Sequence, residues 1–176
     1  MSEFREILSA EFISITGGLL AGILLAGMAG RLELIPGLLV LIPGFLEMRG
    51  NISGSLSARL VTALYLGTLK PTISGKPLLV QNVLAALSLS VVVSALLGVG
   101  AFGIIAFTTS VLFYKIIAIA VIAGLLTNVI EIPSTVALIF WLFRRGYDPN
   151  NIMGPYLTTS GDIVSLISLA IATVIV

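Results

Sequence analysis

Long apolar segments, separated by short polar ones, fill almost the whole chain. The apolar segments cover residues 12–30, 34–69, 78–105, 110–143 and 155–176. A helix needs about 20 predominantly apolar residues to cross the hydrocarbon core of a bilayer, and each segment is of that order or longer. The pattern therefore predicts an all-α integral membrane protein with five transmembrane helices, in a single domain that covers residues 1–176.

The composition excludes several other classes of protein. Hydrophobic residues make up 58% of the chain and charged residues 10%, and the mean hydropathy is +1.18. Soluble domains carry about 25% charged residues. A net charge of +1 gives no indication of nucleic-acid binding, and the absence of Cys and His excludes thiolate or imidazole metal sites and Cys- or His-dependent catalysis. We therefore expect a protein that is not an enzyme and that needs no organic cofactor.

The basic residues predict the orientation, because Lys and Arg are enriched in cytoplasmic loops. With the N-terminus inside, the basic residues at the cytoplasmic ends of the helices are Arg5, Lys70, Lys76, Arg144 and Arg145. The outer ends then hold Arg31 and Lys115. This bias favours an N-in, C-out, multi-pass protein of the plasma membrane, and the acidic start of the chain indicates that the first helix is retained rather than cleaved.

The second segment becomes polar between residues 43 and 59. Glu47, Asn51 and Ser55 recur there every four residues, which places them on one face of a helix. Carboxylate, amide and hydroxyl oxygens suit a hard divalent cation. Polar groups at membrane depth are tolerated where they are buried in protein or line a wet cavity. The alternative interpretation of this stretch is a cytoplasmic amphipathic loop.

The fifth segment contains one acid, Asp162, and no charged residue follows it. A carboxylate inside the bilayer costs about 2.5–3.5 kcal/mol on insertion scales, so it requires a cation or a charged partner. Thr158 lies on the same helical face as Asp162, and Thr159 lies beside it. The residues leave two interpretations open: a cation site, or a structural salt bridge from Asp162 to Arg49 or Arg59.

Glu131 is a secondary candidate in the fourth segment, where Asn128 and Thr135 share its helical face and Pro133 can kink the helix. It is either a second cation or proton site or the partner of Lys115 or of an arginine from another helix. Of these, we favour the structural role.

Asp148 is a second such candidate, at the start of the fifth helix. We expect it to be a capping or turn residue, with an electrostatic vestibule for cations as the alternative, and an Asn nearby can also cap this helix. Asp148 and Asp162 are 14 residues apart, or about 20 Å if helical. That separation excludes a protease-like pair of aspartates within one chain.

Two stripes of small residues recur at helical spacing. They comprise Gly18, Gly22, Ala26 and Gly30 in the first segment, and Ala86, Ser90, Ser94 and Gly98 in the third. Such stripes let helix backbones approach closely. We expect packing within one chain, with contact between two subunits as the alternative.

The second and fifth segments together resemble the membrane domain of MgtE-type magnesium transporters and their eukaryotic solute-carrier relatives. In the second segment the resemblance rests on Gly50-Asn51, then Ser57-Ala58-Arg59-Leu60 and Gly67. In the fifth it rests on Asp148-Pro149-Asn150-Asn151, then Pro155, Thr158-Thr159 and Asp162.

The resemblance implies a homodimer of five-helix subunits with a central cation path lined by the second and fifth helices. It implies that Asp162 is the principal metal residue and that Asn51, Thr158 and Thr159 lie along the path. The secondary candidates remain Glu47, Glu131 and Asp148. The implied activity is uptake of Mg²⁺, and the implied partners are membrane lipid and a second copy of the chain.

The chain departs from bacterial MgtE proteins at two points. Only residues 1–11 precede the first apolar segment, so we expect no CBS domain and no N-terminal regulatory domain. The Gly-Asn motif lacks the glutamine that often follows it and is closer to the eukaryotic carriers, which fuse two such halves. Two other functions remain open: a proton- or sodium-coupled divalent cation exporter or exchanger, and a non-transporting membrane scaffold subunit.

Overall fold

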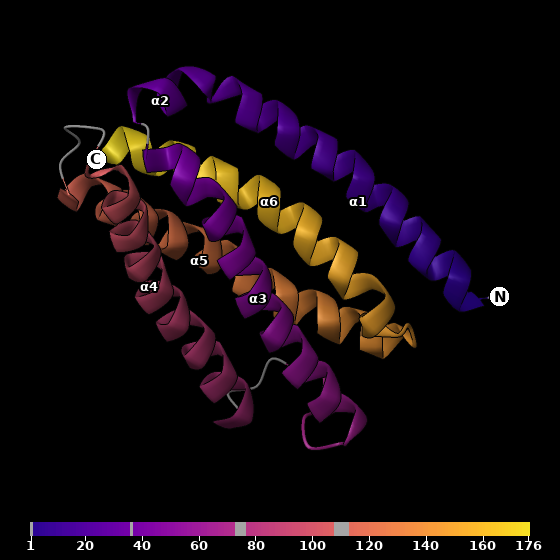
Figure 1. Cartoon of the computed structure of the whole chain (residues 1–176). Helices are drawn as coiled ribbons and strands as arrows, with labels where there is room; N and C mark the ends of the chain where they lie inside the picture. The colour runs from indigo at the N-terminus through magenta and orange to yellow at the C-terminus, as the bar shows by residue number, and fades with distance from the viewer. Residues whose placement is uncertain (1, 36, 73–76, 108–112) are drawn as a thin grey trace.

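A computed structural model describes residues 2–35, 37–72, 77–107 and 113–176 of the chain. Over these residues the chain is all-α, which confirms the predicted class (Figure 1). The helices are α1 (Ser2–Gly27), α2 (Ala29–Leu34), α3 (Gly37–Tyr65), α4 (Pro77–Ile105), α5 (Phe113–Arg145) and α6 (Pro149–Ile175).

Four of the described helices, α1, α4, α5 and α6, are long and apolar enough to cross a membrane. Helix α3 has 29 residues, which gives it a length of about 43 Å at 1.5 Å per residue. Its length is therefore sufficient, but the polar stretch around Glu47, Arg49 and Asn51 lowers its hydropathy. Among the described residues, four of the five predicted spans are thus helices that are apolar enough to cross a membrane, and α3 is not one of them.

The helix bounds follow the predicted segments closely, except at the starts of two helices and at the short α2, which the sequence did not predict. Helix α1 begins at Ser2 rather than at residue 12, and α6 begins at Pro149 rather than at residue 155. Proline suits the first turn of a helix, because the N–H that it lacks has no helical partner there. The predicted start of the fourth segment, at residue 110, and the predicted cytoplasmic Lys76 lie outside the described residues.

Helix α3 lies at the centre of the molecule, packed against α4, α5 and α6, while α1 packs along α6 on the outside (Figure 1). Fully buried residues recur along α3, among them Leu38, Phe45 and Leu60. This packing buries Arg49, in the polar centre of α3.

Polar contacts near the helix ends establish the direction of three helices. Asn151 in α6 donates to Glu6 in α1 over 3.3 Å, and Arg31 in α2 donates to Thr173 in α6 over 2.9 Å. Tyr65, the last residue of α3, donates to the residue that caps the start of α6. Helices α1 and α6 therefore run in one direction and α3 runs in the other.

The two stripes of small residues behave differently. The α4 stripe is buried, and a Cβ at Gly98 would lie 2.7 Å from the Ile117 backbone of α5, so the packing prediction is confirmed there. On α1, a Cβ at Gly17 would overlap Thr159 of α6, whereas one at Gly18 would meet nothing within 4 Å. The prediction that the Gly18 stripe packs within the chain is wrong. The face of α1 that contacts α6 includes Gly17, one residue before Gly18.

Candidate ionic site between helices α3, α5 and α6

A buried ion pair joins α3 to α6. The Arg49 side chain is 2% exposed, and its Nη2 lies 2.8 Å from Oδ1 of Asp162, whose side chain is 26% exposed. Arg49 Nη1 also donates to the Leu157 carbonyl over 2.6 Å. The guanidinium thus bonds both the carboxylate and the backbone of α6. Removing one member of such a buried pair costs about 3–5 kcal/mol, because the other charge is left without a partner.

The structure therefore forms the salt bridge that the sequence left open, and it selects Arg49 over Arg59. The two arginines are ten residues apart on α3, so at about 3.6 residues per turn they project from different faces. Arg59 is exposed and lines a groove beside Asn82 of α4. Asp162 is only partly buried, so its carboxylate still reaches the surface of the protomer.

Gly161 permits this close approach between α3 and α6. A Cβ at this position would overlap the Arg49 guanidinium, at both Nη1 and Cζ. Any other residue would therefore displace the arginine from its two acceptors on α6. The sequence shows a glycine before Asp162, but only the helix packing reveals why it is needed.

Glu131 of α5 is a second acid at the same centre. It is 1% exposed, lies beside Ser160, and interacts electrostatically with Arg49 and Asp162. Its Oε2 atom has no hydrogen-bond partner, and the neighbouring Ser160 hydroxyl donates to the Tyr156 carbonyl. Of the two basic neighbours predicted for Glu131, the structure therefore provides the arginine from another helix, Arg49, and not Lys115.

The predicted polar column on α3 is present and faces outward. Glu47, Asn51 and Ser55 are all exposed, and Asn51 Nδ2 donates to Glu47 Oε1 over 3.2 Å. The alternative interpretation of this stretch as a loop is wrong, because α3 is continuous from Gly37 to Tyr65. Among the described residues, no hydrogen bond joins Asn51 to Asp162 within one protomer.

The two threonines before Asp162 point in different directions. Thr158 is exposed and donates to the Gly154 carbonyl over 3.1 Å, one turn before Asp162. The Thr159 methyl group lies toward Gly17 of α1, and its hydroxyl has no hydrogen-bond partner. Thr158 thus lies on the same face of α6 as Asp162, whereas the Thr159 side chain points toward α1.

Asp148 caps α6, as predicted. Its Oδ1 accepts from the Asn150 backbone N–H over 2.9 Å and from the Tyr65 hydroxyl over 3.0 Å. The prediction of an asparagine cap is wrong, because Asn150 and Asn151 lie inside the first turn. Asp148 and Asp162 sit at separate places on one helix, each with its own partner.

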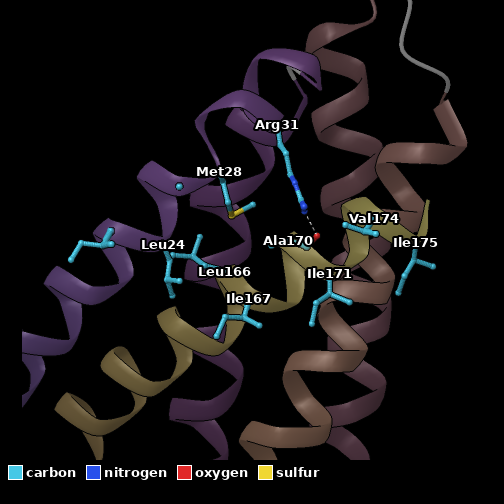
Figure 2. A pocket seen from close by; sticks show the side chains of 11 residues that line it. Leu24, Met28, Arg31, Leu166, Ile167, Ala170, Ile171, Val174 and Ile175 are labelled. Carbon is cyan, nitrogen blue, oxygen red and sulfur yellow. Dashed lines mark hydrogen bonds between the residues drawn. The ribbon is translucent and has the colours of Figure 1, made fainter.

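A cavity of about 540 Å³ lies apart from this centre, between α1 and α6 (Figure 2). Its lining is apolar and includes Leu24, Met28 and Ile171, with Arg31 at one end. It presents no carboxylate to a cation. In the described ranges of the chain, no three acidic residues gather into a group that could hold a metal ion.

Charged side chains buried between apolar helices define a multi-pass membrane protein with an ionic centre. The sequence profile of the MgtE family, described as "Divalent cation transporter", matches residues 42–172, from α3 to α6. The chain therefore belongs to the MgtE family of divalent cation transporters, as the sequence motifs indicated.

A eukaryotic relative supports this assignment. The chain is 30% identical over 139 residues to solute carrier family 41 member 2 of Gallus gallus. The alignment covers 74% of this chain and 24% of that protein, so the chain spans about a quarter of the relative's length.

Proposed function

We propose that this protein carries Mg²⁺ into the cell across the plasma membrane, along a path lined by α3 and α6 of two copies of the chain. The proposal rests on the position of Asp162. It is the acid of an otherwise uncharged helix, and it reaches the protomer surface beside Thr158. In a family of divalent cation transporters, such a carboxylate is the natural ligand of the transported ion.

The proposed topology has five crossings, with the N-terminus inside. Helix α3 is the additional span. Packing against three other helices buries its Arg49, and a second copy of the chain would cover its exposed polar column of Glu47, Asn51 and Ser55. Arg5, near the start of α1, lies at the end of the molecule where α3 finishes and α6 begins. Lys70 follows α3 and Arg144 lies in the last turn of α5, so the basic residues gather at the proposed cytoplasmic end.

Exposed polar groups on α3 and α6 support a second copy of the chain. Asn51 and Thr158 are exposed on the protomer, and in a bilayer they would otherwise face lipid tails. A two-fold dimer that covers both faces would bring two Asp162 carboxylates toward one axis. Mg²⁺ keeps several waters and needs only one or two carboxylates, so this set suffices.

The membrane potential supplies the driving force. An inside-negative potential contributes about 2.3 kcal/mol per charge per 100 mV, or about 4.6 kcal/mol for a divalent ion. Uptake therefore requires no second energy source.

Flux measurements in proteoliposomes test this proposal. Wild-type protein should let Mg²⁺ enter the liposomes, where an enclosed dye reports it. The rate of Mg²⁺ entry should increase with an inside-negative potential. Asp162→Asn should reduce the rate by about 100-fold or more, because the amide removes the charge that meets the ion. Glu33→Gln, which alters an exposed acid in α2, is the matched control and should retain wild-type flux. Normal flux through Asp162→Asn would exclude the site.

The same assay separates the two alternatives. A coupled exporter or exchanger would make Mg²⁺ flux depend on an imposed pH or Na⁺ gradient. A scaffold subunit would show no flux and no stabilisation by divalent cations.

A further inference from the structure

Arg49 creates an electrostatic difficulty for a cation site at Asp162. The guanidinium already neutralises this carboxylate at 2.8 Å. A neutral ion pair attracts a divalent cation only weakly, and the arriving ion must also displace a buried arginine. A working site therefore requires further negative charge and another acceptor for Arg49.

Glu131 meets both requirements. Its carboxyl group interacts with Arg49 and Asp162 from α5, and its Oε2 has no hydrogen-bond partner although the side chain is 1% exposed. Arg49 Nε is also buried without a hydrogen-bond partner. A buried donor and a buried acceptor, both unsatisfied and both in the same charge cluster, are suited to pair with each other once Arg49 leaves Asp162.

We propose that Arg49 is an internal counter-cation that binds Asp162 in the cation-free protein and transfers to Glu131 when a divalent cation binds Asp162. This inference rests on the proposed function, because it assumes that Asp162 meets the transported ion. Arg49 and Glu131 are then positioning residues that need not touch the ion. No covalent bond is broken; one guanidinium exchanges one carboxylate for another.

The charge balance supports this exchange. In the ionised form that accepts Arg49, Glu131 brings the set of Arg49, Asp162 and Glu131 to one net negative charge in each protomer. Two protomers then carry two negative charges, which one divalent cation neutralises. Without Glu131 the centre would be neutral before the cation arrived, and binding would leave an uncompensated excess of buried positive charge.

Equilibrium binding of Mg²⁺ to purified protein in detergent, measured by calorimetry, tests the exchange. Glu131→Gln keeps the shape of the side chain but removes the second acceptor, so binding should weaken by about tenfold or more. Arg49→Gln removes the competitor, so binding should tighten by about tenfold. The double variant should lie near wild type, because the two effects oppose each other.

Flux measurements add a second readout. Arg49→Gln should lower both the half-saturating Mg²⁺ concentration and the maximal rate, because tighter binding slows release. Should this variant fail to fold, Arg49→Lys replaces it: it retains the charge, loses the planar fork, and should tighten binding more modestly.

The outcomes separate this inference from the proposed function. Wild-type affinity in Glu131→Gln, with binding lost in Asp162→Asn, would overturn the exchange and leave the site intact. Wild-type affinity in Asp162→Asn would overturn both. A fall in melting temperature of Glu131→Gln without a change in affinity would indicate a purely structural acid and would also overturn the exchange.

Discussion

Arg49 lies against Gly161 so closely that the glycine has no room for a side chain. This contact holds the guanidinium against the Leu157 carbonyl and Asp162 at the same time. The sequence reduced the partners of Asp162 to Arg49 or Arg59, but it could not choose between them. The choice depends on how α3 is rotated about its axis, which packing against α5 and α6 determines. For the same reason the sequence could not choose between Lys115 and an arginine of another helix as the neighbour of Glu131.

Gly161→Ala should therefore destabilise the protein strongly. The methyl group would displace Arg49 and leave buried charges without their partners, which costs about 3–5 kcal/mol. Thermal unfolding in detergent measures this effect. Gly103→Ala on α4 is the control, because a Cβ there meets nothing within 4 Å. Equal melting temperatures for the two variants would contradict the geometry described for Arg49.

At the scale of helices, apolar run length predicted most of the bounds, because a spanning helix must satisfy its own backbone hydrogen bonds across the whole bilayer. It missed the start of α1, where the acidic residues after Met1 gave no apolar signal, and it missed the short α2. The stripe of small residues beginning at Gly18 also indicated the wrong contact face of α1. A helix that is apolar on all sides shows no amphipathic pattern, since lipid and protein interior are equally apolar.

The contact between α1 and α6 leaves no room for a side chain at Gly17. Gly17→Val should force α1 away from Thr159, and overpacking of this kind costs about 1–3 kcal/mol. The adjacent Gly18→Val should leave the melting temperature nearly unchanged, because that position is open. Thermal unfolding of the two variants, side by side, provides the measurement. A larger loss for Gly18→Val would mean that α1 is rotated relative to this structure.

At the scale of the whole molecule, the motifs in the second and fifth segments identified the family correctly, since α3 and α6 do meet at Asp162. Composition predicted a membrane protein, and four of the five predicted spans correspond to described helices that are apolar enough to cross a membrane. The pairing of two chains remains a proposal that depends on exposed polar faces. Which polar faces of α3 and α6 stay exposed depends on how the long helices pack. The pattern of residues along the chain does not determine that packing.

The stoichiometry of Mg²⁺ binding, measured by calorimetry together with the molecular mass of the same sample, tests whether two chains share one ion at Asp162. We expect one strongly bound ion for every two chains, because two Asp162 side chains share one divalent cation on the dimer axis. This binding should disappear in Asp162→Asn while the dimer mass is retained. One ion for every single chain, or unchanged binding in Asp162→Asn, would contradict the account.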